Sequence, residues 1–278
     1  MAFCWPDFLA TVGYSWYMFD GDVSYQRLAS KGFTETPASF HFLQISAPIF
    51  LLILTRLRMP VSTTFLLLSS FTASQDAITK VLQKSVLGYG IAFSTAFIFW
   101  IIMDRLLQNA FKGKADNKWL VLQWITSGFL WSLWIMQDAA NIAVYLPRSL
   151  SIIEFSIFSI TILFGLGVIL FLKGDKIQQV VEEKSDVKDV RPATIIDMVY
   201  TFILILFTWV NTVPMSTTWV FIGLLGGREL AIKIKRHKPL SSSWKLIGKD
   251  LSYALIGLLI SILIAISANE SLRSQLFK

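Results

Sequence analysis

The chain has 278 residues, of which 54% are hydrophobic and only 15% are charged, and its mean hydropathy is +0.60. This balance excludes an ordinary soluble globular protein and is typical of a polytopic helical membrane protein. The net charge of +7 does not indicate a nucleic-acid partner, because the basic residues lie between apolar segments, where they orient a membrane protein. The single cysteine, Cys4, excludes a disulfide within one chain and a thiolate metal cluster.

Four segments without acidic or basic residues predict transmembrane helices. They lie at 85–103, 119–137, 155–172 and 251–268. Each is long enough to cross about 30 Å of hydrocarbon as a helix, and none alternates as the strands of a barrel do. A fifth uncharged segment, 198–227, is too long for one perpendicular helix. Its central proline predicts two elements that meet there.

We therefore predict an all-α integral membrane protein, with about eight transmembrane or half-membrane helices in one polytopic domain over residues 1–278. Three basic segments, 105–118, 173–191 and 228–249, are expected to face the cytoplasm. The longest polar stretch, 173–192, is expected to be a cytoplasmic loop. No cleavable signal peptide is apparent, so insertion into the plasma (inner) membrane would rely on the spans themselves.

A short motif occurs twice and predicts an internal repeat. Pro-Val-Ser-Thr-Thr at 60–64 recurs as Pro-Met-Ser-Thr-Thr at 214–218, and each copy lies between two apolar runs. About five crossings separate the copies, so they should enter the bilayer from opposite sides. That arrangement is an inverted repeat with broken helices, with 1–110 as an incomplete first repeat and 119–270 as the second. The alternative is a chance recurrence, because Ser and Thr are common in membrane helices.

The chemistry of this motif favours an anion. Proline suits the first turn of a helix, and the Ser and Thr that follow can accept from the free backbone amides there. At membrane depth such a helix start offers hydroxyls, amides and the positive end of the helix dipole. We expect a neutral, hydroxyl-rich anion site in which helix dipoles, rather than arginine, balance the charge.

A second polar segment, Gln-Asp-Ala-Ala-Asn at 137–141, directly follows an apolar span. One interpretation makes Asp138 a helix cap in water at the outer surface and Asn141 a turn residue. The other makes the segment a broken helix that contacts substrate, with Asp138 binding a coupling cation. A weaker echo near the start places Asp20 at the end of a similar tryptophan-containing stretch.

Metal binding and catalysis find little support in the sequence. His41 and His237 are far apart, and neither has a second ligand at helical spacing, so no metal site is predicted. No nucleophile, base and orienting acid stand together, so we do not expect an enzyme.

The motifs together resemble the inorganic phosphate transporter family, whose members carry two inverted repeats. Each repeat of that family has an Asn-Asp-x-Ala-Asn segment and a later Pro-Val-Ser-Thr-Thr-His segment. Residues 137–141 are similar to the former, with Gln137 in place of the first Asn, and 60–64 and 214–218 are similar to the latter.

The resemblance implies a transporter of inorganic phosphate in a lipid bilayer, without a cofactor or nucleic acid. Asp138, and Asp20 if it stands in the matching place, would serve the co-transported sodium or proton. The residues implied to hold phosphate are Ser62, Thr63, Thr64, Gln137, Asn141, Ser216, Thr217 and Thr218.

The departures from the family pattern keep a second function open. Phe65 and Trp219 replace the histidines, and the interval from Asp20 to Pro60 is 40 residues, against 76 from Asp138 to Pro214. Because alternating access needs two comparable halves, the chain could be a non-transporting membrane subunit or regulator on a transporter scaffold. A homodimer that completes the shortened repeat would restore the first hypothesis, a phosphate or oxyanion symporter.

Overall fold

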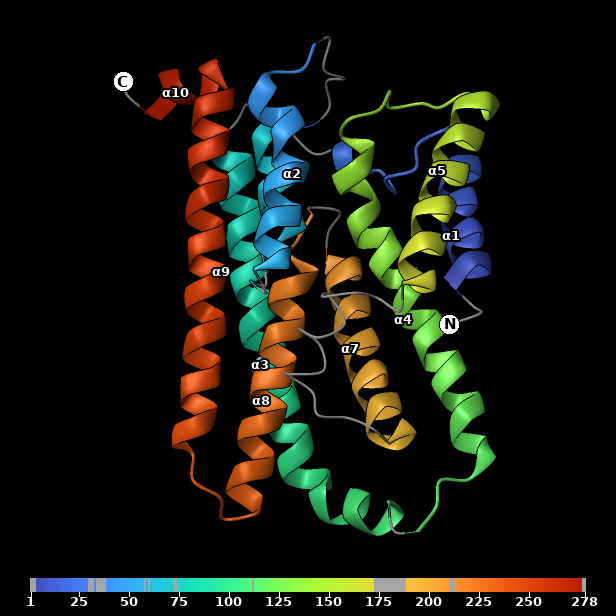
Figure 1. Cartoon of the computed structure of the whole chain (residues 1–278), viewed down its shortest axis with the longest axis vertical. Coiled ribbons are helices and arrows are strands. Elements are labelled where there is room, and N and C mark those ends of the chain that lie inside the picture. The colour runs from blue at the N-terminus through green and yellow to red at the C-terminus, as the bar shows by residue number, and fades with distance from the viewer. Residues whose placement is uncertain are drawn as a thin grey trace.

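The computed structural model describes residues 4–29, 33, 39–57, 59, 61–72, 75–111, 113–172, 189–210 and 214–276. These residues form helices and connections, without a strand (Figure 1). Within this described part, five helices are long and apolar enough to cross a membrane: α3 (Gln75–Ala110), α4 (Asn117–Ala143), α5 (Ile152–Phe171), α7 (Val190–Val210) and α9 (Ser241–Ala268). The prediction of an all-α integral membrane protein is confirmed. The other helices are α1 (Cys4–Met18), α2 (Phe42–Arg56), α8 (Thr217–Lys235) and α10 (Glu270–Leu276).

The connections that carry basic residues lie at one end of the bundle, which we call the basic end. The α3–α4 and α8–α9 connections lie there together with the start of α7 (Figure 1). Arg191 near the start of α7 donates from Nη2 to the Gly113 carbonyl oxygen at 3.1 Å, and its guanidinium lies over the Phe111 ring. The predicted loops are shorter than expected because α3 and α8 extend into them. Helix α7 likewise begins at Val190, inside the predicted loop, whose residues 173–188 lie outside the described part.

The opposite end receives a hairpin that enters the bundle and returns. Helix α2 runs from this end to Arg56, and the short helical segments η2 (Thr64–Leu68) and η3 (Ser69–Phe71) lead back (Figure 1). The Ser70 carbonyl oxygen accepts from Gln44 Nε2 at the start of α2 and from Asn269 Nδ2 after α9. The start of α2, η3 and the end of α9 therefore lie together. We call residues 42–71 the first hairpin.

A second hairpin, residues 190–235, enters from the basic end. Helix α7 ends at Val210 and α8 begins at Thr217, so the predicted break at Pro214 is confirmed. The expected place of the proline in the first helical turn is wrong for this copy. Ser216 is the N-cap, with extended backbone angles, and Pro214 precedes it by two residues. The proline of the first copy, Pro60, lies outside the described residues.

Helices α3 and α8 cross closely because two glycines of α8 face the backbone of α3. A Cβ on Gly223 would lie 2.5 Å from the Tyr89 carbonyl oxygen, and one on Gly227 would overlap the Phe93 carbonyl oxygen. Glycines four residues apart are a common device for close helix contact in membranes. The contact fixes α8, and with it the second hairpin, on α3.

Replacing Gly227 with valine should destabilise the protein strongly, because the added side chain meets backbone that cannot move aside. Overpacking of this kind costs about 1–3 kcal/mol or more. The measurement is thermal unfolding in detergent, followed by tryptophan fluorescence. Gly90→Val on α3 is the control, because nothing lies within 4 Å of a Cβ at that position. Equal melting temperatures for the two variants would contradict the assigned contact.

Candidate functional site

The serines of the two copies of the repeated motif make the same local contact. Ser62 Oγ accepts from the Phe65 backbone N–H and Ser216 Oγ accepts from the Trp219 backbone N–H, each at 3.2 Å. Both serines are buried, and the Phe65 and Trp219 rings pack with their centroids 5.3 Å apart. Each serine therefore caps a helical segment, and Phe65 and Trp219, which directly follow the two motifs, form an aromatic contact between the hairpins.

The two hairpins meet at these caps. Thr64 Oγ1 donates to the Met215 carbonyl oxygen at 3.1 Å, across 151 positions of the sequence. The Ser216 backbone N–H donates to Ser85 Oγ of α3 at 2.9 Å. The end of α2 and the start of α8 accordingly lie near mid-height of the bundle rather than at either end (Figure 1). Hydroxyls from both motifs thus face one interior region.

Helix α4 connects the two hairpins through one carboxylate and one amide. Asp138 Oδ2 accepts from Thr217 Oγ1 at 2.9 Å, and Asp138 Oδ1 accepts from Asn141 Nδ2 at 3.2 Å. Asn141 Nδ2 also donates to Thr63 Oγ1 at 3.0 Å. Asp138 therefore contacts the second hairpin, and Asn141 the first.

Both sequence interpretations of the 137–141 segment are wrong about its backbone. Helix α4 runs unbroken from Asn117 to Ala143, so Asp138 is neither an outer cap nor part of a broken helix. The segment contains two alanines and no proline or glycine, and such residues continue a helix. The break belongs to the hairpins, whereas the acidic segment is a continuous helix packed against both.

Two buried amide oxygens in this region lack hydrogen-bond partners among the described residues, namely Gln137 Oε1 and Asn141 Oδ1. Gln137 is fully buried, and its Nε2 donates to Thr208 Oγ1 of α7 at 2.8 Å. Thr208 Oγ1 in turn donates to a backbone carbonyl, which supports the assigned amide orientation. Unpaired buried acceptors are rare, and they suit a cation or a proton carried by a ligand.

The structure brings together most of the predicted site residues. The cluster contains Ser62, Thr63, Thr64, Asp138, Asn141, Ser216 and Thr217. Thr218 is half-buried beside it, without a side-chain hydrogen bond among the described contacts. Asp20 lies elsewhere, in the turn after α1, where its carbonyl oxygen accepts from Ser149 Oγ in the α4–α5 connection. Asp20 and Asp138 therefore do not occupy equivalent positions.

A buried arginine and a buried lysine beside the cluster escaped the sequence analysis, which expected a neutral site without arginine. Arg27, in the short segment η1 (Arg27–Ala29), is 2% exposed, and its Nε donates to the Met136 carbonyl oxygen at 2.7 Å. Arg27 interacts electrostatically with Asp138, and Lys84 of α3, 7% exposed, interacts with Arg27. Neither residue belongs to a motif, so only the three-dimensional packing reveals them.

A fully buried tyrosine of α7 supports the same region. Tyr200 OH donates to the Thr217 carbonyl oxygen at 2.7 Å and accepts from Trp134 Nε1 at 3.0 Å. These bonds fix the first residue of α8 against α4 and α7. Thr217 is thereby held at both its carbonyl and its hydroxyl, so its orientation toward Asp138 is well defined.

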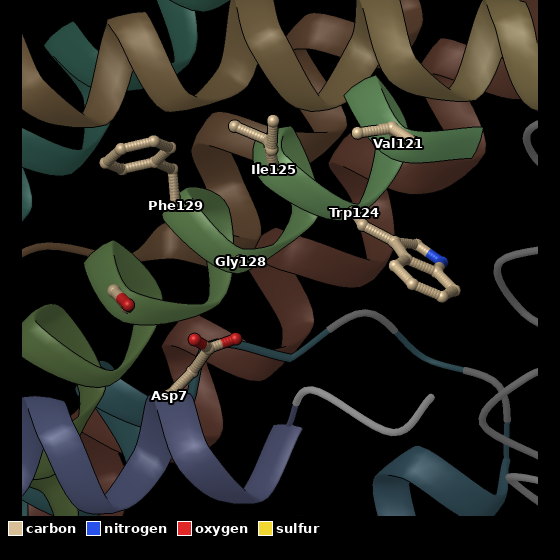
Figure 2. Close-up of a pocket in the computed structure, with 7 residues that line it drawn as sticks. Asp7, Val121, Trp124, Ile125, Gly128 and Phe129 are labelled. Carbon is tan, nitrogen blue, oxygen red and sulfur yellow. The ribbon is translucent and has the colours of Figure 1, made fainter. Parts of the chain in front are cut away.

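A cavity of about 400 Å³ lies apart from this cluster, between α1 and α4 (Figure 2). Asp7 of α1 points toward Gly128 of α4, and most of the remaining lining is apolar, including Trp124 and Phe129. These aromatic side chains are more than half exposed. A single carboxylate beside an apolar, exposed helix face makes a poorer ligand site than the hydroxyl cluster.

The described residues contain no group of three or more His, Cys, Asp or Glu side chains that could hold a metal ion. Comparison with known proteins finds no matching family model, curated protein or solved structure.

Proposed function

We propose that this chain is a secondary transporter that moves inorganic phosphate or a similar oxyanion across the plasma or inner membrane, coupled to sodium or protons. One observation carries the proposal: two Pro-x-Ser-Thr-Thr motifs, far apart in sequence, meet through the Thr64–Met215 hydrogen bond. The direct contact between the copies and their shared serine cap support a true repeat over a chance recurrence.

The arrangement of the hairpins supports an inverted repeat. They enter from opposite ends of the bundle, and each breaks near its middle (Figure 1). In transporters with this architecture, the starts of broken helices face the substrate near the bilayer midplane. Alternating access would then expose the meeting point of the hairpins to one side and then to the other.

The site divides into donors for the anion and acceptors for the cation. The hydroxyls of both motifs and the amides at the start of α8 are donors that an oxyanion needs. Asp138 and the unpaired oxygens of Gln137 and Asn141 are acceptors. The two amide oxygens, Gln137 Oε1 and Asn141 Oδ1, would accept a hydrogen bond from a proton that the phosphate carries. If the anion carries no such proton, they would contact the coupling cation.

The coupling follows from the cost of charge in an apolar environment. Opposite charges attract strongly where water is scarce, so a cation at Asp138 lowers the cost of bringing an anion to the same depth. Uptake should therefore require both species.

A non-transporting subunit or regulator is the second candidate function. The position of Asp20 favours it, because the first half of the described chain does not repeat the carboxylate that Asp138 supplies in the second. In a homodimer, a second copy of the chain could supply the carboxylate that the first half lacks, and the chain would then still be a transporter.

The deciding experiment is uptake of radiolabelled phosphate by proteoliposomes that contain the purified protein. Wild-type protein should accumulate phosphate when an inward sodium or proton gradient is imposed, and should not do so in symmetric buffer. Excess unlabelled sulfate and arsenate then define which oxyanions compete. Folded protein without gradient-dependent uptake of any of them would favour the subunit or regulator.

A further inference from the structure

Arg27 is buried beside the central site, by which we mean Asp138, Asn141 and the hydroxyls of the two motifs. Its Nε donates to the carbonyl oxygen of Met136, two residues before Asp138 on α4. The guanidinium therefore lies beside the helical turn that holds the carboxylate, and the two groups interact electrostatically. Arginine stays protonated at any physiological pH, so this positive charge is permanent.

A buried lysine of α3 lies near Arg27. Lys84 is buried, interacts electrostatically with Arg27, and directly precedes Ser85, whose hydroxyl accepts from the Ser216 backbone N–H at the break of the second hairpin. Arg27 and the turn of α3 that carries Lys84 thus border the region where the two motifs meet. A guanidinium offers a planar fork of donors that matches two oxygens of a tetrahedral oxyanion.

We propose that Arg27 is the anion-binding charge of the central site, held by Asp138 in the empty protein and released to the oxyanion when a coupling cation occupies Asp138. The inference rests on the proposed function and specifies its coupling step. Asp138 attracts Arg27 and repels an incoming anion. A cation on Asp138 weakens both effects, so each ligand strengthens the binding of the other.

The test is equilibrium binding of radiolabelled inorganic phosphate to the purified full-length protein in detergent, with and without sodium and at two pH values. Wild-type protein should bind phosphate more tightly when sodium, or a higher proton concentration, is present. Arg27→Gln should weaken binding about 10- to 100-fold, the effect of losing a hydrogen bond to a charged group. It should also reduce the cation dependence to the part that comes from direct repulsion between Asp138 and the anion. Arg27→Lys should retain part of the phosphate affinity and part of the cation dependence that Arg27→Gln loses.

Asp138→Asn separates this role from structural support. It should bind phosphate without a cation about as tightly as wild-type protein does with one, because the carboxylate no longer holds Arg27. The double variant Arg27→Gln/Asp138→Asn removes both charges and avoids a buried unpaired charge if Arg27→Gln fails to fold. It should bind weakly and without cation dependence, whereas wild-type affinity in this variant would overturn the inference.

Arg191→Gln is the matched control, because Arg191 is also a buried arginine but pairs with Asp189 at the basic end of the bundle. It should leave phosphate affinity and its cation dependence unchanged. Wild-type behaviour of Arg27→Gln, or wild-type cation dependence of Asp138→Asn, would overturn the inference and leave the proposed function standing. Wild-type protein that binds no phosphate would overturn the proposed function, and the inference with it.

Discussion

Asp138→Asn should abolish gradient-driven phosphate uptake while leaving the protein folded. The asparagine keeps the size of the side chain and can still accept from Thr217 Oγ1, but it no longer carries the charge that a coupling cation needs. Loss of the coupling should lower gradient-driven uptake about 100-fold, near the upper range of coupling between two sites. The measurement is the initial rate of radiolabelled phosphate uptake into proteoliposomes.

Asp197→Asn provides a matched control for this prediction. Asp197 is a half-buried carboxylate of α7 that also accepts two hydrogen bonds, from Gln123 Nε2 and Ser127 Oγ of α4. Its neighbours belong to neither motif, so uptake should be close to wild type. If Asp138→Asn transports normally, the coupling ion binds elsewhere. If both variants lose uptake equally, the loss follows from replacing any carboxylate inside the membrane and assigns no special role to Asp138.

Thr217→Val and Ser62→Ala should each weaken phosphate transport, because each removes one hydroxyl from the meeting point of the hairpins. Thr217→Val nearly preserves volume and removes the bond to Asp138, and Ser62→Ala removes the cap on Phe65. A lost hydrogen bond to a charged ligand should raise the KM for phosphate about 10- to 100-fold. The measurement is the concentration dependence of uptake, normalised to the amount of folded protein.

Two buried hydroxyl residues outside the site serve as controls. Thr194 on α7 donates to Gln123 Oε1, and Ser261 on α9 donates to the Gly257 carbonyl oxygen. Thr194→Val and Ser261→Ala should leave the KM for phosphate near the wild-type value. Normal transport by both Thr217→Val and Ser62→Ala would show that the motifs have a structural role only.

Sequence reasoning predicted the helical membrane fold and the break at Pro214, because both depend on local properties. Uncharged apolar segments of sufficient length can only be helices in lipid, and a proline after a polar pair interrupts a helix. The repeated motif also predicted where polar hydroxyls gather. Its two copies contact each other directly, and sequence similarity alone cannot show such a contact.

The remaining features of the site depend on packing between distant segments. Asp138 and Asn141 lie in a continuous helix, and their partners Thr217 and Thr63 come from segments more than 70 residues away. Arg27 is in a short segment without a motif, so its burial against α4 could not be predicted. For this reason the sequence predicted a neutral site without arginine, whereas the structure buries Arg27 beside Asp138.

The second hairpin has its two arms on different neighbours, because α7 packs against α4 while α8 packs against α3. Gly223 and Gly227 make the α3–α8 contact especially tight. Any tilt of α4 relative to α3 would therefore move α7 and α8 relative to each other. The Thr217–Asp138 hydrogen bond joins α8 to α4, and so connects the α3–α8 pair to the α4–α7 pair. A ligand that binds the Asp138 carboxylate therefore also changes how strongly these two helix pairs are held together.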